Sequence, residues 1–208
     1  MASLVVEQVG HYFGSLLLFR RVSFAMEGGE SLAVTGANGA GKSTLLRILA
    51  GVLRPKAGTV TLRADGQSVA PEAHPRHVGL VAPYLGLYET LTARENLTFL
   101  AQARRLPDSN SRIQSVLDRV GLADRADDPV SAFSSGMQHR VKYAAAILAE
   151  PPLLLLDEPS VTLDDAGRDL VDIIITEQQD RGGLVVVATN RPDEAGRHDR
   201  TLRIEEHR

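Results

Sequence analysis

The sequence predicts an α/β protein built on a mostly parallel β-sheet. Two short, almost purely apolar runs, Leu153–Leu156 and Leu184–Ala188, have the composition of strands buried on both faces. Between them, Asp165–Gln179 has the length of a crossover helix, and strands joined in this way pair in parallel. A third apolar run, Ser31–Thr35, leads at once into a glycine-rich loop and the helical segment Ser43–Leu53. This alternation of strand and helix is typical of an α/β sheet protein.

Further elements surround this core. Short runs rich in β-branched and aromatic residues indicate strands near the start of the chain and after the first helix. From Thr92 the apolar period changes from two to about 3.6. Thr92 and Glu95 there form a capping box. The remaining predicted strands are Leu4–Val9, Leu17–Met26, Thr59–Arg63 and Val78–Ala82. The remaining predicted helices are one that starts after Thr92, Arg112–Val120 and Gly136–Ala149. Pro107–Ser111 is expected to be a surface loop.

The composition is that of one soluble globular domain. With 208 residues, 43% hydrophobic and 24% charged, the chain is long enough for one core and too short for two ordinary domains. We therefore expect residues 1–208 to form a single domain. The formal net charge of -3 provides no broad basic field, so no nucleic-acid partner is expected. The chain lacks cysteine, which excludes disulfides, and it lacks an apolar stretch of the ~20 residues that span a bilayer. Any membrane association must come through a partner.

The glycine-rich loop after Ser31–Thr35 has a phosphate-binding pattern, G-x-x-x-x-G-K-[ST]. Glycines allow the backbone to wrap closely around an anion. Consecutive N–H groups form a nest, and the following helix directs its positive end at the phosphates. Lys42 would reach the β- and γ-phosphates, and Ser43 would hold Mg²⁺. The predicted phosphate-binding residues are Gly36, Ala37, Asn38, Gly39, Ala40, Gly41, Lys42, Ser43 and Thr44.

Two adjacent acids, Asp157 and Glu158, follow the run Leu153–Leu156. Open α/β sheets bind their ligands at the carboxyl ends of the strands. Asp157 would take an indirect or water-mediated position on Mg²⁺, and Glu158 would deprotonate or orient the water that attacks the γ-phosphate. Alone, such a pair could be solvated acids at a strand end. Downstream of a phosphate loop, and followed by Pro159, it predicts a site that hydrolyses nucleoside triphosphates.

A third motif narrows the class of P-loop NTPase. The string Phe133-Ser134-Ser135-Gly136-Met137-Gln138-His139-Arg140 opens the alanine-rich helix. It resembles the LSGGQ signature of ATP-binding cassette (ABC) proteins, with Phe133 for Leu, Ser135 for the first Gly and Met137 for Gln. Ser160-Val161-Thr162-Leu163-Asp164 resembles the D-loop of the same family. An isolated Ser-Ser-Gly would be merely a helix N-cap, but these motifs occur in the family's order and cover essentially the whole chain.

The resemblance implies the ABC ATPase fold, which is a P-loop NTPase core with a mostly parallel sheet, an N-terminal antiparallel β-subdomain and an α-helical subdomain at approximately residues 84–150. It implies ATP and Mg²⁺ as ligands. It also implies a head-to-tail dimer with a second cassette, homomeric or heteromeric, in which Ser134 and Gly136 of one subunit close over the ATP on the other. A hydroxyl and a helix N-terminus can stabilise phosphate charge in this way. The family stacks an aromatic on adenine, and Phe13 matches best, with Tyr12 as the alternative; either could be an ordinary strand aromatic.

Two positions depart from the family pattern. Asn190 stands where the family has its switch histidine; its amide can donate a hydrogen bond but carries no charge. His198 lies too far along the chain to replace it. Pro83, in Ala82-Pro83-Tyr84, stands where the Q-loop glutamine is expected. The predicted catalytic residues are Glu158, Lys42 and Asn190, with Ser43 and Asp157 at the metal.

The resemblance implies the ATPase subunit of a transporter, cytoplasmic and peripheral on the cell membrane, docked on a separate transmembrane permease. Tyr84–Phe99 would form the docking surface, because this segment opens with large apolar residues that a solvated loop does not require; the alternative is that they pack under the helical subdomain. These residues are Tyr84, Leu85, Leu87 and Tyr88. The short single cassette and the Ser-Ser-Gly-Met string are similar to ATPases of the haem-exporter type, used in cytochrome c biogenesis. The alternatives are a soluble ABC ATPase acting on DNA or ribosomes, which usually has two cassettes, and a regulatory cassette with weak hydrolysis, against which Glu158 argues.

Overall fold

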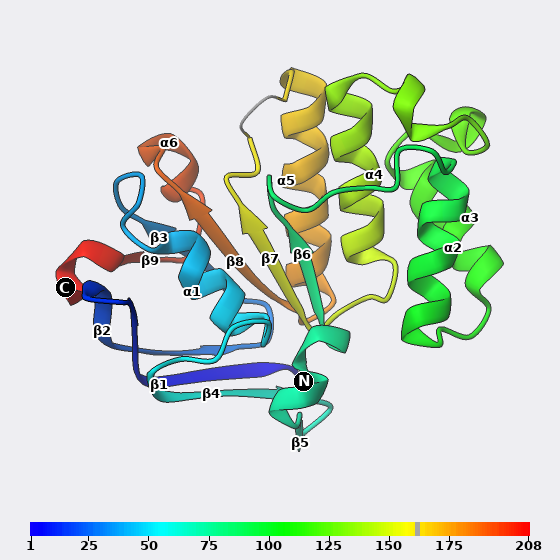
Figure 1. Cartoon of the computed structure of the whole chain (residues 1–208). Coiled ribbons are helices and arrows are strands. Elements are labelled where there is room, and N and C mark those ends of the chain that lie inside the picture. Colours follow the sequence, from blue (N-terminus) through cyan, green and yellow to red (C-terminus); the bar gives the residue numbers. More distant parts are fainter. Residues whose placement is uncertain (161–162) are drawn as a thin grey trace.

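The computed structural model describes residues 1–160 and 163–208, and it contains two β-sheets of different kinds (Figure 1). The larger sheet has five parallel strands in the order β6-β7-β8-β3-β9, and the smaller has four antiparallel strands in the order β2-β1-β4-β5. The strands are β1 (Ser3–Phe13), β2 (Leu16–Glu27), β3 (Ser31–Thr35), β4 (Ala57–Ala64), β5 (Gln67–Ser68), β6 (Val78–Val81), β7 (Leu153–Asp157), β8 (Leu184–Thr189) and β9 (Arg200–Arg203). The α-helices are α1 (Lys42–Leu49), α2 (Ala93–Arg104), α3 (Ser109–Arg119), α4 (Ser135–Ile147), α5 (Asp165–Asp180) and α6 (Pro192–Ala195).

The central strands of the parallel sheet are buried on both faces, as their continuous apolar composition predicts. Because successive side chains point to opposite faces, each strand supplies two separate cores. On β7, Leu155 packs into a core shared with the antiparallel sheet, whereas Leu154 and Leu156 pack into a second core under the helices. The parallel sheet is therefore the common wall of two hydrophobic cores.

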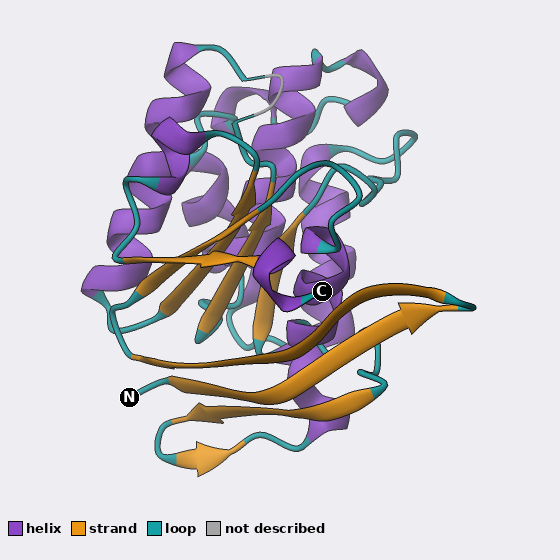
Figure 2. Cartoon of the chain, turned by 90° about the vertical axis from the view of Figure 1, so that its left-hand side faces the viewer, coloured by secondary structure: helices purple, strands orange, loops and turns teal. Residues whose placement is uncertain are grey.

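Helix α1 lies between the two sheets (Figures 1 and 2). Its apolar residues Leu45, Leu46 and Leu49 are buried in the core that includes Leu4 of β1 and Val186 of β8. The helix begins directly after the glycine-rich loop, so this packing fixes the loop against the sheet edge. The antiparallel sheet thus holds α1 in place from the side opposite to the parallel sheet.

The other face of the parallel sheet is covered by α4 and α5, with α2 and α3 packed beyond α4. Three of these helices begin with side-chain caps that satisfy their first N–H groups. Thr92 and Glu95 form the predicted capping box of α2, Ser134 caps α4 and Asp164 caps α5. Among the described helices, none is long and apolar enough to cross a membrane.

The α/β fold with its mostly parallel sheet and its antiparallel N-terminal sheet is confirmed, and the errors are at element ends. Helix α3 begins at Ser109, so the expected loop Pro107–Ser111 is partly helical. Helix α1 ends at Leu49 rather than Leu53. The edge strand β9 was not predicted, since its residues are largely exposed and lack an apolar run.

Candidate nucleotide-binding site

Three adjacent strands bring the predicted site residues to one edge of the parallel sheet. β8 lies between β7 and β3, and all three run in the same direction. Asp157 is opposite Ala188, and Thr35 is opposite Thr189. The glycine-rich loop, the acid pair and the Asn190 segment therefore leave the sheet side by side, at the carboxyl edge where α/β sheets bind ligands.

The backbone of the glycine-rich loop requires glycine at its two ends. Gly36 has φ 150° and Gly41 has φ 106°, both outside the ordinary range of other residues. A Cβ on Gly41 would lie 2.9 Å from Cδ1 of Phe19, and one on Gly36 would lie 2.9 Å from Cγ2 of Ile204. Gly41 is also the N-cap of α1, which has neither a side-chain cap nor an acid in its first turn. These N–H groups are suited to bind an anion.

Lys42 connects the loop to the acid-bearing strand. Its ammonium donates hydrogen bonds to the carbonyl oxygens of Gly36 (2.8 Å) and Ala37 (3.4 Å), and it lies 3.3 Å from Oε1 of Glu158. The lysine is only 6% exposed. A buried cation held by two carbonyls and one carboxylate is a fixed positive charge beside the loop.

The two acids occupy different environments. Asp157 is 3% exposed, and burial raises the pKa of its carboxyl, while a hydrogen bond from Ser43 opposes the shift. Glu158 is less buried and has φ 52°, a left-handed conformation that is uncommon outside glycine and frequent at functional sites. Its N–H is fixed by a 2.8 Å hydrogen bond to the carbonyl of Ala188.

The same acids fit a bound magnesium ion. Oδ1 of Asp157 and Oε2 of Glu158 are buried, and neither has a hydrogen-bond partner among the described residues. Such acceptors are costly unless a ligand satisfies them. With the Ser43 hydroxyl, they form a set of hard oxygen donors of the kind that Mg²⁺ prefers.

Asn190 lies against the glycine-rich loop. Its Nδ2 donates a 3.2 Å hydrogen bond to Oδ1 of Asn38, across 152 residues of sequence. Asn190 follows the fully buried strand β8, which fixes its backbone. A neutral donor amide therefore stands at the loop, where the family has a histidine.

Pro83 lies beside the acids, at the position expected for the Q-loop glutamine. It lines a cavity of about 240 Å³ together with Asp157, Glu158, Ser135 and His139. Proline has neither a backbone donor nor a polar side chain. The polar groups that face the acids across this cavity come from α4 instead. Burial, reinforced by Lys142, lowers the pKa of the His139 imidazole.

The remaining predicted residues come from the antiparallel sheet and from the start of α4. Phe13 ends β1 with 51% of its side chain exposed, and its ring stands edge-on to His11 at 4.8 Å. Tyr12 is exposed as well, under Lys56. Ser134 caps α4 by accepting a hydrogen bond from the Met137 N–H (3.3 Å), and Gly136 follows in the first turn. Of the D-loop string, Val161 and Thr162 lie outside the described residues.

One contact of the glycine-rich loop was not predicted, and it comes from the end of the chain. Oε1 of Glu205 accepts a 2.8 Å hydrogen bond from the Ala37 N–H, and the neighbouring Ile204 is fully buried against Gly36. Strand β9 pairs with β3 and brings this segment to the loop. No local pattern could reveal a contact between residues 168 positions apart.

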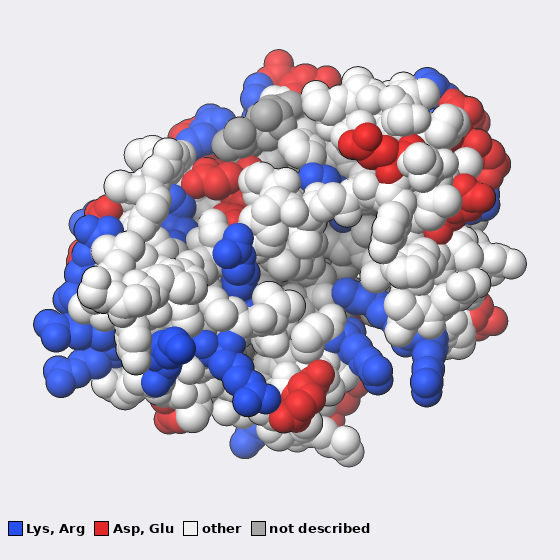
Figure 3. All heavy atoms as spheres, viewed as in Figure 1, with Lys and Arg blue, Asp and Glu red and all other residues white. Residues whose placement is uncertain are grey.

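The segment Tyr84–Phe99 borders an apolar groove of about 320 Å³. Tyr84 (43%) and Tyr88 (56%) are exposed, whereas Leu85 and Leu87 are half-buried. The predicted cluster is thus divided between surface and packing. Figure 3 shows mostly uncharged surface around a hollow on this face, with basic side chains beside it. The lining includes Leu85, Leu87, Tyr88, Phe99, Arg104 and Lys142.

A glycine-rich loop that opens a helix, with a buried lysine and an acid pair on the neighbouring strand, defines a P-loop ATPase. A sequence profile of the family described as "ABC transporter" matches residues 19–161. The chain belongs to the ABC transporter family and is an ATP-binding subunit that hydrolyses ATP.

Relatives and solved structures agree with this assignment. The cytochrome c biogenesis ATP-binding export protein CcmA of Rhizobium meliloti is 42% identical over 195 residues, 91% of each chain. The linearmycin resistance ATP-binding protein LnrL of Bacillus subtilis is 33% identical over 191 residues, 90% of this chain and 60% of that one. A solved "ATP binding subunit of ABC transporter" is 28% identical with TM-score 0.86, covering 97% of this chain and 86% of that one. The cbiO1 subunit of Clostridium perfringens is 27% identical with TM-score 0.75, covering 90% and 78%.

Proposed function

We propose that the chain is the ATPase subunit of a haem exporter that serves cytochrome c biogenesis, and that residues 1–208 form one nucleotide-binding domain with a helical subdomain at about residues 84–150. The proposal for the site rests on one observation, the convergence of Lys42, Glu158 and Asn190 on the glycine-rich loop. The loop amides and Lys42 bind the phosphates, and Ser43 and Asp157 hold Mg²⁺. Glu158 orients the attacking water, and Asn190 donates a hydrogen bond to the γ-phosphate.

The proposed active unit is a head-to-tail pair of cassettes. Ser134 and the N-terminus of α4 are directed at the γ-phosphate bound by the partner, where a hydroxyl and a helix dipole stabilise negative charge. Phe13 stacks on adenine, which its exposure at the end of β1 permits.

The proposed docking site for the permease is the groove beside Tyr84–Phe99. Its lining is apolar, with Tyr88 and Phe99 packed edge-on at 5.2 Å and both more than half exposed. Arg47 of α1 lies over the Tyr84 ring at 4.1 Å. This contact joins the segment that borders the groove to the helix that starts at the phosphate loop.

The proposed substrate, haem, comes from the names of relatives such as the CcmA proteins of Rhizobium meliloti and of Pseudomonas putida strain KT2440, the latter 38% identical over 176 residues. The test is deletion of the gene in its host, followed by staining for covalently bound haem in c-type cytochromes. We expect the stain to disappear, and expression of the wild-type chain, but not of Lys42→Ala, to restore it. Unchanged staining together with a new sensitivity to an exported antibiotic would refute haem export and favour the activity that the name of LnrL describes.

A further inference from the structure

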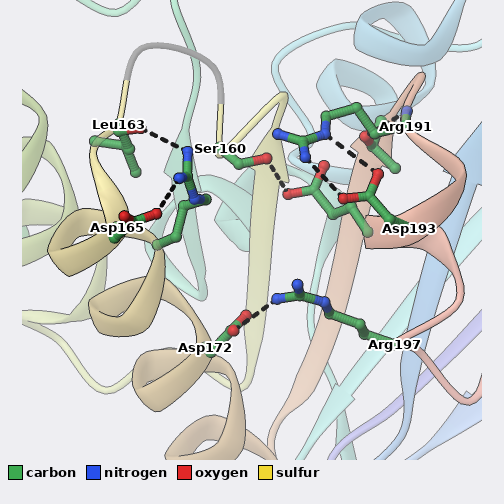
Figure 4. A network of polar contacts seen from close by, with 10 residues as sticks. Ser160, Leu163, Asp165, Asp172, Arg191, Asp193 and Arg197 are labelled. Carbon is green, nitrogen blue, oxygen red and sulfur yellow. Dashed lines mark hydrogen bonds and ion pairs between the residues drawn. The ribbon is translucent and has the colours of Figure 1, made fainter.

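The two residues that follow Glu158 are held from two different helices. The hydroxyl of Tyr143, on α4, donates a 3.2 Å hydrogen bond to the carbonyl of Pro159. The hydroxyl of Ser160 donates a 2.6 Å hydrogen bond to Oε1 of Glu194, on α6 (Figure 4). Pro159 and Ser160, which follow the proposed water-orienting Glu158, are therefore bonded to two helices. One is α4, which Ser134 caps, and the other is α6, which follows Asn190.

One of the two carboxylate oxygens of Glu194 has no protein partner in the described part of the chain. The residue is half-buried, and this oxygen, Oε2, is itself buried. Burial, together with the charge of Glu194, raises the pKa of the Tyr143 phenol. Burial also lowers the pKa of His198, against the effect of the Glu194 charge. A buried carboxylate oxygen without a hydrogen-bond partner lowers the stability of the fold. The hydrogen bond from Ser160 to the other oxygen is therefore not an incidental contact between two solvated surface side chains.

The link through Glu194 differs from the other polar contacts around it. Arg191 and Asp193 pair with each other on α6, and Arg197 pairs with Asp172 of α5 at 2.7 Å, all of them exposed (Figure 4). None of these pairs reaches the segment after Glu158. Within the part of the chain that the structure describes, the Ser160–Glu194 hydrogen bond is the side-chain contact that joins that segment to α6.

We infer that Glu194 is a positioning residue that couples the Asn190 segment to the Glu158–Ser160 segment. When Ser160 moves, Glu194 moves α6 with it, and Asn190 lies four residues before Glu194, two residues before α6 begins. The donor at the phosphate loop and the acid at the water thereby take up their positions together. This inference rests on the proposed roles of Glu158 and Asn190.

The test is a double-mutant cycle of Ser160→Ala and Glu194→Ala, with ATPase activity and ATP affinity measured separately. We expect each single change to lower kcat by about 10- to 100-fold, as displacement of a positioned group does. The Kd for ATP stays within about threefold, because neither residue touches the phosphate loop. The double variant is no slower than the slower single variant, since both changes break one link. Glu194→Gln and Ser160→Thr, which retain the acceptor and the hydroxyl, recover most of the rate.

Asp172→Ala is the matched control, because it breaks an exposed pair between α5 and Arg197, which follows α6, and this pair does not reach Ser160; its kcat stays unchanged. Thermal unfolding of each variant separates misfolding from coupling, and Ser160→Ala removes a single oxygen, so it leaves the fold intact. Unchanged kcat in Ser160→Ala, or additive losses in the double variant, overturns the inference. If the wild-type chain itself fails to hydrolyse ATP, the proposed site roles fail instead, so the two failures are distinguishable.

Discussion

Replacement of Asn190 by alanine tests whether this residue takes the role of the histidine that the family has at its position. The amide Nδ2 lies 3.2 Å from Oδ1 of Asn38 in the phosphate loop, and we propose that it donates to the γ-phosphate when ATP is bound. Loss of one preorganised donor lowers kcat by roughly 10²–10³. A neutral amide makes weaker bonds to phosphate than a charged group does, so we expect the lower limit, about 10²-fold or ~2.7 kcal/mol.

The assay is steady-state ATP hydrolysis by the chain assembled with its permease. If Asn190 acts mainly in the transition state, kcat falls and KM changes little. Asn190→His, which supplies an imidazole donor, should retain or raise the rate at neutral pH. Asn110, an exposed residue of α3, provides the control: Asn110→Ala should behave as wild type. An undiminished kcat in Asn190→Ala, or a raised KM with kcat unchanged, would refute the assignment.

Three further outcomes are expected. Glu158→Gln keeps the shape but removes the base, so kcat falls by about 10²–10⁴ and gel filtration with MgATP shows a trapped dimer; only monomer would contradict the head-to-tail pair. Lys42→Ala removes a charged donor, so a fluorescent ATP analogue binds about 10- to 100-fold more weakly, and unchanged affinity would remove the phosphate site. Hydrogen bonds from the side chain and N–H of Ser31 lower the pKa of Asp199 below its usual 3.8. This carboxylate therefore stabilises the fold above that pH, and the contribution is lost as pH falls through the lowered pKa. Accordingly, denaturant titrations should show Asp199→Asn less stable than wild type at neutral pH, with the gap closing in acid; a constant gap would disprove the linkage.

The parts of the fold that the sequence predicted are those set by local pattern. Leu153–Leu156 and Leu184–Ala188 are continuous apolar runs because both faces of each strand are buried. The phosphate loop has glycine at positions whose backbone angles other residues rarely adopt. Thr92 and Glu95 determine the start of α2 through their own hydrogen bonds, so a four-residue window was enough to find it.

The parts that could not be predicted depend on contacts between distant segments. Glu205 reaches the Ala37 N–H only because β9 pairs with β3, and β9 itself has no apolar pattern. In the sequence, nothing distinguishes Glu194 from an ordinary surface acid. Its role becomes visible only in the structure, where Ser160 lies beside it. The division of the Tyr84–Tyr88 cluster into exposed tyrosines and half-buried leucines likewise depends on how α2 packs.

The neutral side chain at position 190 changes the charge balance at the phosphates. Within one chain Lys42 is the cation closest to the acids, Asp157, Glu158 and Glu205 supply negative charge beside the loop, and Asn190 contributes no charge. Under the proposed roles, Mg²⁺ and the helix of a second cassette supply the further positive charge that the transition state requires. An amide also does not titrate, whereas an imidazole changes charge at about pH 6.5. The ratio of Asn190→His to wild-type rates should therefore depend on pH around that value, and a flat ratio would show that residue 190 does not contact the reacting phosphate.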